Sequence, residues 1–198
     1  FIDESDAVVF GDSVGAYDGG VGLLPFRHGT SLKPATNPIT EIGARGTMTA
    51  GKITLRDFNP VHPRLDMDVS AKGPTELGAE YYDYPGEYLE TKDGEQYVRT
   101  RIEELHSQFE LAQGQTNARG LSTGFLVKLT GQPRADQNRE YLVVSAQHQL
   151  DYSEYESMAE TGTSYDCSFS MLNSRQPYRS QRTTPKPFVQ GPQTAVVV

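Results

Sequence analysis

Apolar and polar residues alternate along much of this chain, and this period of two residues is typical of strands with one buried face. The clearest examples are two runs at residues 125–130 and 141–150, separated by the sequence GQPRADQN at 131–138. Pro133 cannot donate to a strand ladder, and Asn138 can bond its own backbone in a turn, so both strands must end near this segment. The pattern predicts two strands joined by a loop.

Other runs of the same kind are shorter. They predict strands at residues 7–10, 39–45, 47–57, 65–69 and 165–171. Gly46 predicts a turn between the second and third of these runs, which are therefore expected to form an antiparallel pair. The residues between the first two runs have no clear period, so we expect a glycine-rich loop over 11–22 and irregular structure over 23–38.

One segment has the period of a helix. Its apolar residues recur three or four positions apart, at Val98, Ile102, Leu105, Phe109 and Ala112. Asp93 and Gln96 have the spacing of a reciprocal N-terminal cap, and Gly114 is a typical C-terminal stop, so we predict a helix over about 94–113. The helix is amphipathic, so its apolar stripe must be buried against a sheet.

These elements predict a mainly β chain of the α+β class, in which strands at 39–70 and 116–171 build an antiparallel barrel-like domain with one amphipathic helix. Of the 198 residues, 36% are hydrophobic and 22% are charged, and no apolar run approaches the length of a membrane span. This is typical of a soluble globular protein with one domain or two small ones. The chain begins at Phe1 instead of Met and stops within a β-branched run at 195–198, so we expect an internal fragment of a longer protein.

The formal charge of −8 is unevenly distributed. Residues 76–110 hold ten carboxylates against three basic residues, whereas residues 172–198 hold three arginines, one lysine and no acid. An acidic chain is a poor partner for nucleic acid, which needs a clustered basic face. The basic end segment could dock on the acidic body, within one molecule or across subunits, or it could be a solvated, extended linker.

Four segments, spread in order over nearly the whole chain, resemble the hub domain of the VgrG proteins, which form the spike of the type VI secretion system. They are GKITLRDFNPVHP at 51–63, YDYPGEY at 82–88, GQPRADQNREYLVVSAQH at 131–148 and RTTPKPFVQGPQTAVVV at 182–198. Ordered matches over this length are much more specific than a single short motif.

The resemblance implies a fragment of the phage-hub-like domain over 1–176, a Pro-rich linker over 177–194 and the first strand residues of a truncated OB-fold domain at 195–198. Such hubs are related to the baseplate hub of contractile phage tails. They are homotrimers whose paired barrels form a pseudo-sixfold ring, which caps a hexameric Hcp tube and carries the needle. This fragment is expected to lack the first of the two paired barrels.

Partners and location are implied by the same resemblance. Effector cargo is a further partner of such spikes, which assemble in the bacterial cytoplasm and are secreted through the type VI apparatus. The resemblance implies no enzyme activity, catalytic residue, cofactor or metal, and neither nucleic-acid binding nor stable membrane insertion by this fragment. A prophage tail or baseplate hub protein is the alternative, because it uses the same hub.

One short motif points to a different function. VVFGDSV at 8–14 resembles the nucleophile block of GDSL (SGNH) esterases, in which Ser13 would attack an acyl carbon. That chemistry also needs a histidine base oriented by an acid, which the family supplies in an Asp-x-x-His block. None of the four histidines has an aspartate three residues before it, and there is no Gly-x-Asn-Asp oxyanion segment. A serine esterase is therefore a remote alternative, since a Gly-containing turn after an edge strand would have the same residues.

Two further candidates have simpler explanations. His62, Asp66 and Asp68 could be metal ligands, but no second histidine is placed to complete the set, so a solvated strand face is favoured. Cys167 is the single cysteine and is interpreted as a small buried hydrophobe, because a reactive thiolate would need a basic neighbour.

Four tyrosines gather in one short segment, at Tyr81, Tyr82, Tyr84 and Tyr88. They could form a recognition surface, or they could be aromatic plugs that cover one end of a barrel. A carbohydrate- or partner-binding β module is accordingly a third hypothesis for the chain. His106 and His148 are interpreted as packing or surface residues.

Overall fold

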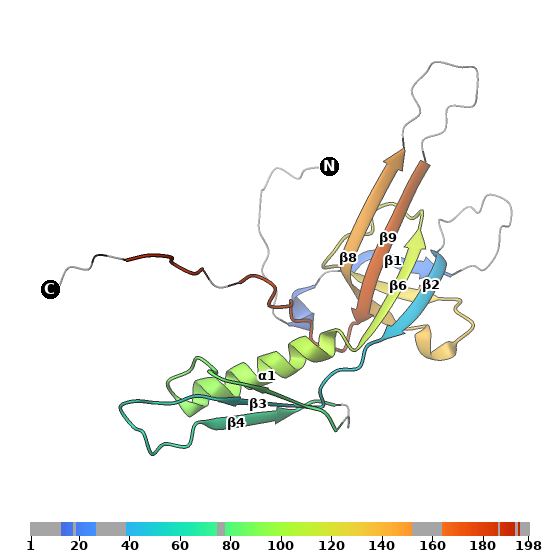
Figure 1. Ribbon diagram of the computed structural model, residues 1–198. Coiled ribbons are helices and arrows are strands. Elements are labelled where there is room, and N and C mark those ends of the chain that lie inside the picture. Colours follow the sequence, from blue (N-terminus) through green and yellow to red (C-terminus); the bar gives the residue numbers. More distant parts are fainter. Residues whose placement is uncertain are drawn as a thin grey trace, which may run out of the picture.

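The computed structural model describes residues 13–17, 19–26, 39–74, 78–151, 164–185, 187–192 and 194. These residues form two units, a curled six-stranded sheet and a three-stranded sheet with a helix on one face (Figure 1). The predicted class, mainly β with one amphipathic helix, is confirmed. The strand predicted at 7–10 and the strand residues predicted at 195–198 lie outside the described residues.

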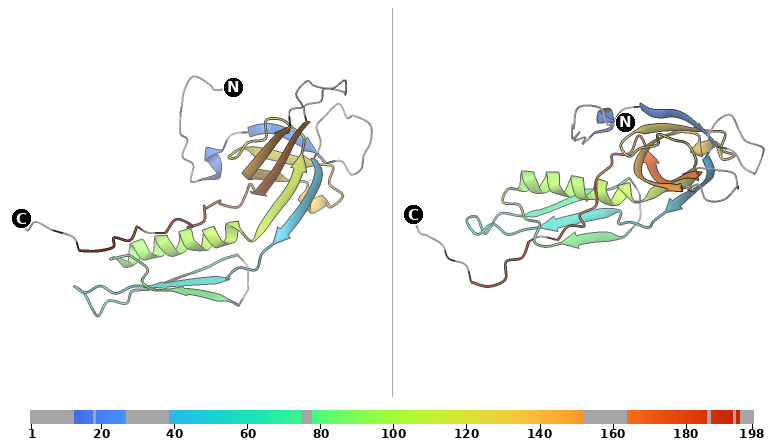
Figure 2. Two further views of the ribbon diagram at one scale, coloured as in Figure 1. Left: turned by 45° about the horizontal axis from the view of Figure 1, so that its top comes forward. Right: turned by 90° about the horizontal axis from the view of Figure 1, so that it is seen from above.

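The six-stranded sheet forms the barrel. Its strands are β1 (Gly19–Pro25), β2 (Ile39–Gly46), β6 (Glu110–Thr116), β7 (Leu126–Thr130), β8 (Glu140–Asp151) and β9 (Ser164–Asn173). They lie in the order β1-β7-β8-β9-β6-β2, and all neighbours are antiparallel except β1 and β7. A single bridge between Phe26 and Ile39 joins the two outer strands, so the sheet curls round on itself (Figure 2). Two short 3-10 helices, η1 (Val14–Ala16) and η2 (Ala135–Gln137), precede β1 and β8.

Inward-pointing residues of these strands, with Ala118 and Leu121 from the segment between β6 and β7, form one apolar core. Its buried members are Leu24, Ile39, Ala112, Ala118, Leu121, Val127, Leu129, Tyr141, Val143, Cys167, Phe169 and Met171. The predicted common face of the last strand is confirmed, because Cys167, Phe169 and Met171 are buried and Tyr165 packs partly buried against them. Each fully buried aliphatic side chain contributes roughly 1.5–3 kcal/mol relative to exposure. Burial of this core therefore favours the curled form of the sheet.

The smaller unit, called the helix unit below, is inserted between β2 and β6. It contains β3 (Lys52–Arg56), β4 (Asp68–Lys72), β5 (Glu80–Asp83) and the helix α1 (Thr91–Ser107). β3 is the middle strand, antiparallel to β4 and parallel to β5. α1 packs on one face of this sheet (Figure 1), over a core of Ile53, Leu55, Met67, Val69, Tyr88, Val98 and Ile102.

The predicted antiparallel pair of 39–45 and 47–57 is wrong. β2 pairs with β6, and β3 lies in the other sheet. The chain leaves the barrel after Gly46 instead of turning back, and the N–H of Thr47 donates to the carbonyl of Phe109, 2.8 Å away, where the chain returns. The strands between residues 52 and 72 consequently belong to the helix unit and not to the barrel.

The helix ends at Ser107, earlier than predicted, and no side chain caps its N-terminus, with Asp93 already inside the first turn. β6 begins at Glu110, so Ala112 and Gly114 lie in the barrel and not on the helix. The reason is that this segment forms ladders with both β2 and β9 and buries Ala112 in the barrel core. Two strand ladders and core burial outweigh a local helical period.

β1 is a strand in a segment for which the sequence predicts a loop followed by irregular structure. Its glycines weaken the strand signal, because they offer no side chain to a pleated surface. The strand forms because β7 supplies a parallel ladder and because Leu24 fills the barrel core.

Candidate functional site

The motifs RDFNP and YDYPGEY meet at the end of the helix unit that lies away from the barrel (Figure 1). Asp57 joins them, because its carboxylate accepts hydrogen bonds from the backbone N–H of Glu87 at 2.5 Å and of Tyr88 at 3.2 Å. The Tyr88 hydroxyl lies within hydrogen-bonding distance of the carbonyls of Leu55 and Met67. Burial, with the Asp57 carboxylate nearby, raises the pKa of the Tyr88 phenol to about 12, so the hydroxyl stays a donor at neutral pH.

The position of the Tyr88 ring depends on two glycines. A Cβ added to Gly86 would lie 2.4 Å from the ring, and one added to Gly94 would lie 2.7 Å from it. Glu87, which lies between Gly86 and Tyr88 in the sequence, has a positive φ of 63°. Tyr88 is therefore an aromatic plug, as one of the two predicted alternatives has it, but it fills the helix unit and not the end of the barrel.

Two other tyrosines point outward. Tyr82 and Tyr84 are 56% and 57% exposed, and they line a shallow groove of about 430 Å³ together with Phe58 and Leu65, which are 54% and 47% exposed. Three of these four residues are aromatic, and we call the four together the aromatic patch. Exposed aromatic side chains grouped in this way are typical of an interaction surface. Tyr88 thus has the plug role, whereas the recognition role, which the exposed aromatic patch would suit, stays a prediction.

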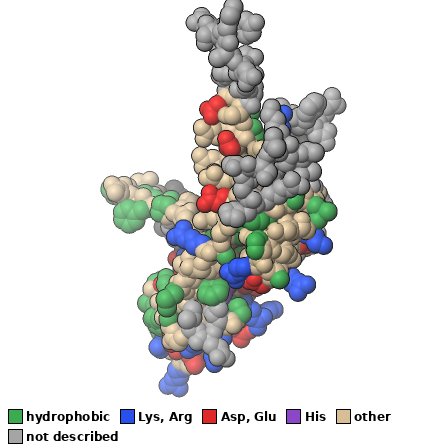
Figure 3. All heavy atoms as spheres, turned by 90° about the vertical axis from the view of Figure 1, so that its right-hand side faces the viewer, with side chains coloured by type: hydrophobic (Ala, Val, Ile, Leu, Met, Phe, Trp, Pro, Cys, Tyr) green, Lys and Arg blue, Asp and Glu red, His purple; other side chains and the backbone are tan. Residues whose placement is uncertain are grey.

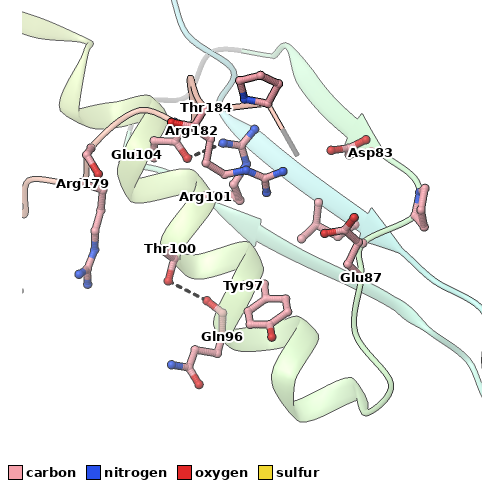
Figure 4. Close-up of a pocket in the computed structure, with 15 residues that line it drawn as sticks. Asp83, Glu87, Gln96, Tyr97, Thr100, Arg101, Glu104, Arg179, Arg182 and Thr184 are labelled. Atoms are coloured by element: carbon pink, nitrogen blue, oxygen red, sulfur yellow. Dashed lines mark hydrogen bonds and ion pairs between the residues drawn. The ribbon is translucent and has the colours of Figure 1, made fainter. Parts of the chain in front are cut away.

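A larger groove, of about 840 Å³, runs beside α1 (Figure 4). Asp83 and Glu87 line one side of it, and Arg101 of the helix and Arg182 of the C-terminal segment line the other. Arg101 is paired with Glu104 one turn further along the helix. The described lining holds the hydroxyls of Ser180 and Thr100 but no histidine, so no imidazole base stands beside them there.

The basic C-terminal segment lies along α1 in the same molecule (Figure 2). The Nε of Arg179 bonds to the Oε2 of Glu103 at 2.8 Å, and the backbone N–H of Arg182 bonds to the Oε1 of Glu104 at 3.0 Å. Of the arrangements left open by the charge pattern, docking within one molecule is therefore the one observed. The charge imbalance was the only sequence signal for it, and it did not identify Glu104 as the acceptor.

Ser13 is exposed just before η1, where its backbone carbonyl accepts from the N–H of Ala16. Residues 8–12 of the esterase-like motif lie outside the described part of the chain. Within that part, no hydrogen bond links Ser13 to a histidine. The geometry therefore offers the esterase alternative no support.

The remaining candidates form two separate pairs of neighbours, Asp66 with Asp68 in the helix unit and His148 opposite Cys167 in the barrel. Asp66 and Asp68 are exposed, and Asp68 pairs with Arg56 at 3.4 Å. Among the described residues, no three His, Cys, Asp or Glu side chains gather closely enough to hold a metal ion. His148 bonds through Nδ1 to the hydroxyl of Tyr165 at 2.8 Å. Cys167 is fully buried and burial raises the pKa of its thiol, which agrees with a packing role.

His106, near the end of α1, is expected to make stability depend on pH. It is 4% exposed, its Nε2 has no hydrogen-bond partner among the described residues, and burial lowers its pKa from the ordinary value of 6.5. The unfolded chain therefore binds a proton at this position more readily, so the contribution of His106 to the free energy of unfolding is present above about pH 6.5 and is lost as the pH falls below it. Urea midpoints between pH 5 and 8 measure this slope.

His106→Gln should flatten that dependence, because it removes the buried titrating group. His148→Gln is the matched control, since His148 is exposed and the slope of the wild-type protein should remain. Identical slopes for the wild type and His106→Gln would contradict the assignment.

The chain belongs to the phage tail baseplate hub (GPD) family, which matches residues 1–153. Within this class it is similar to type VI secretion system spike proteins of Pseudomonas aeruginosa. It is 43% identical to VgrG1b over 153 residues, which is 75% of this chain and 21% of VgrG1b. It is 35% identical to VgrG1a over 197 residues, which is 96% of this chain and 31% of VgrG1a. The family resemblance predicted from the four segments is confirmed, and the chain spans less than a third of these relatives.

Two solved structures share the fold. The tail protein from Neisseria meningitidis MC58 superposes with a TM-score of 0.54 at 10% identity, over 82% of this chain and 48% of that protein. The 43 kDa tail protein of prophage MuSo2 from Shewanella oneidensis gives 0.55 at 9% identity, over 81% and 46%. The matched family is a tail baseplate hub and these relatives are spike proteins, which supports a structural role; that this chain is not an enzyme stays a prediction.

Proposed function

We propose that this chain is part of the hub of a type VI secretion spike, a structural component that forms a homotrimer, caps an Hcp-like tube ring and carries the needle. The sequence similarity to spike proteins over most of the chain supports the assignment. The observation that supports assembly is a pair of open strand edges in the barrel. A prophage tail hub is the alternative, but the relatives with 35–43% identity are secretion spikes.

The first open edge belongs to β8. β7 pairs with β8 only as far as Leu142, and Gly124 and Phe125 bond to Val143 just beyond. Residues 144–151 then have β9 as their one partner strand among the described residues. With β9 they form a projection above the barrel, called the hairpin arm below, which comprises residues 147–151 and 164–168 (Figure 1).

The second open edge belongs to β2, on the opposite side of the strands β8-β9-β6-β2. Apart from the bridge at Ile39, β2 has β6 as its only described partner, and most of its residues are exposed. An open edge presents unpaired N–H and C=O groups that can accept another strand. Two different edges on one chain permit head-to-tail contacts between copies, and such contacts close into a ring when the rotation fits.

Charge can orient this contact. Figure 3 faces the β2 side and shows acidic side chains on the upper part of the molecule and a mixture of basic and acidic side chains on the lower part. An uneven charge distribution of this kind favours one orientation of its partner over the reverse.

The remaining parts of the proposal concern what surrounds the hub. Residues 1–176 would be the hub fragment, 177–194 the linker, and 195–198 the start of an OB-fold domain that leads to the needle. The protein would assemble in the bacterial cytoplasm, take up effector cargo and leave through the secretion apparatus. Within the described residues, no helix is both long and apolar enough to cross a membrane. The hub would act by shape and symmetry, without catalysis and without binding nucleic acid.

The full-length protein is expected to have the mass of three copies in light scattering at micromolar concentration. The double variant His148→Lys/Leu150→Lys should shift it toward the monomer, because lysine on an open edge opposes strand addition. Both positions lie on the part of β8 that pairs with β9 on one side and has an open edge on the other, and Leu150 is 67% exposed. Met48→Lys, at an 86% exposed position between β2 and β3, is the control and should leave the trimer intact.

Co-sedimentation with purified Hcp tubes tests the capping step. Hub protein should be found with the tubes in an amount proportional to the number of tube ends. A wild-type protein that is monomeric, or that never sediments with tubes, would refute the proposed function.

A further inference from the structure

The C-terminal segment is held against the last turns of α1 by contacts to its main chain as well as to its side chains. Ser107 is completely buried, and its Oγ lies 2.7 Å from the carbonyl of Glu104 and 3.1 Å from the carbonyl of Arg179. The backbone N–H of Arg182 bonds to Glu104, and the side-chain amide of Gln176 donates to the carbonyl of His106. Contacts to backbone atoms fix the path of a chain, whereas exposed ion pairs alone do not.

The burial of Glu104 has no explanation without this segment. Its residue exposure is 7%, and a buried carboxylate is costly unless both oxygens have partners. One oxygen bonds to Arg101, and the other bonds to the N–H of Arg182. The docked segment therefore provides the hydrogen-bond partner of one of the two carboxylate oxygens of Glu104. If the segment moved away, this oxygen would need water in its place.

The same carboxylate connects the segment to β5. Arg101, the helix partner of Glu104, lies with its guanidinium carbon 6.0 Å above the ring of Tyr81. Tyr81 directly precedes Tyr82, which belongs to the aromatic patch. One continuous set of contacts thus runs from the C-terminal segment through Glu104 and Arg101 to the strand that carries this patch.

We infer that residues 176–182 form a docked strap, which is clamped by Glu104 and Ser107 and sets the direction in which the chain leaves the helix unit. The inference rests on the proposed function only for the identity of the domain that follows. The pair of Arg179 and Glu103 adds a salt-sensitive part, because the two side chains are 31% and 34% exposed. Beyond the strap, residues 183–185 and 187–192 are exposed, so the fixed part of the path ends near Arg182.

Trypsin provides a direct test on the full-length protein, because Arg179 and Arg182 are cleavage sites within the strap. In the wild type, cleavage there should be slow compared with cleavage after Arg134, an exposed residue in the loop before β8. The double variant Glu104→Gln/Ser107→Ala should raise the strap cleavage rate about tenfold or more, because it weakens the two clamping groups. Its cleavage after Arg134 should not change.

Glu95→Gln is the matched control, since Glu95 is exposed on the same helix and belongs to none of the strap contacts. Its strap cleavage should equal that of the wild type. Added NaCl should speed strap cleavage in the wild type moderately, through the exposed pair.

Hydrogen exchange on the wild type needs no variant and covers the case in which the double variant unfolds. The amide of Arg182 should be protected, whereas the amides of the exposed residues 187–192 should exchange much faster. Fast exchange at Arg182, or strap cleavage as fast as cleavage after Arg134, would overturn the inference. A trimer with an undocked strap would refute the strap alone, and a monomer with a protected strap would refute the proposed hub function alone.

Discussion

Gly114→Ala is expected to lower the free energy of unfolding by about 3 kcal/mol. A Cβ at this position would lie 2.3 Å from the carbonyl oxygen of Glu41 and 2.9 Å from the ring of Phe169. The first contact is with the main chain of β2, so it can be relieved only by opening the ladder between β2 and β6. Urea unfolding followed by far-UV circular dichroism measures the loss.

Gly43→Ala is the control for this variant. Gly43 lies in the same ladder, opposite Gln113 and one rung away from Gly114, yet a Cβ added to it meets nothing within 4 Å. Its stability should stay within about 0.5 kcal/mol of the wild type. Equal unfolding midpoints for the two variants would mean that β2 and β6 do not approach each other as described.

Tyr88→Ala is expected to cost the helix unit about 3–5 kcal/mol, the range for loss of a large buried aromatic side chain. Tyr88 is 3% exposed, and its ring fills the space between Gly86 and Gly94. Tyr88→Phe keeps the ring and removes the hydroxyl, so it should cost about 1–3 kcal/mol through the carbonyls left without their donor. Thermal unfolding of both variants separates the two contributions.

Tyr84→Ala provides the matched comparison, because Tyr84 belongs to the same motif and is 57% exposed. It should change stability by no more than about 0.5 kcal/mol. If Tyr84→Ala were as harmful as Tyr88→Ala, the assignment of Tyr88 as the plug would be wrong.

The parts of the fold that the sequence predicted correctly are those decided by local patterns. The strands on either side of the loop at 131–138, and the common face of Cys167, Phe169 and Met171, follow from alternation and turn chemistry. The end of the helix and the pairing of β2 could not be predicted in this way. β6 becomes a strand because β2 and β9 lie beside it, and the partner of β2 follows only after the whole helix unit.

The candidate site shows the same division. The sequence indicated that four neighbouring tyrosines were important, but no local period distinguishes Tyr88, which is buried, from Tyr84, which is exposed. The distinction comes from Asp57, thirty-one positions away from Tyr88, whose carboxylate holds the loop backbone. The one sequence feature that relates to this burial is the pair of glycines, Gly86 and Gly94, on either side of Tyr88 in the chain. Both lack the Cβ that would collide with the Tyr88 ring.

β2 and β6 are adjacent in the barrel although the entire helix unit separates them along the chain. The last rung of their ladder joins Gly46 to Glu110, and Thr47 bonds to Phe109 directly beyond it. The helix unit is thus an insertion between two strands of the barrel, β2 and β6, that pair as a hairpin would. The entropic cost of closing a loop rises only slowly with loop length. The helix unit can therefore become longer, become shorter or be replaced without a shift in the register between β2 and β6.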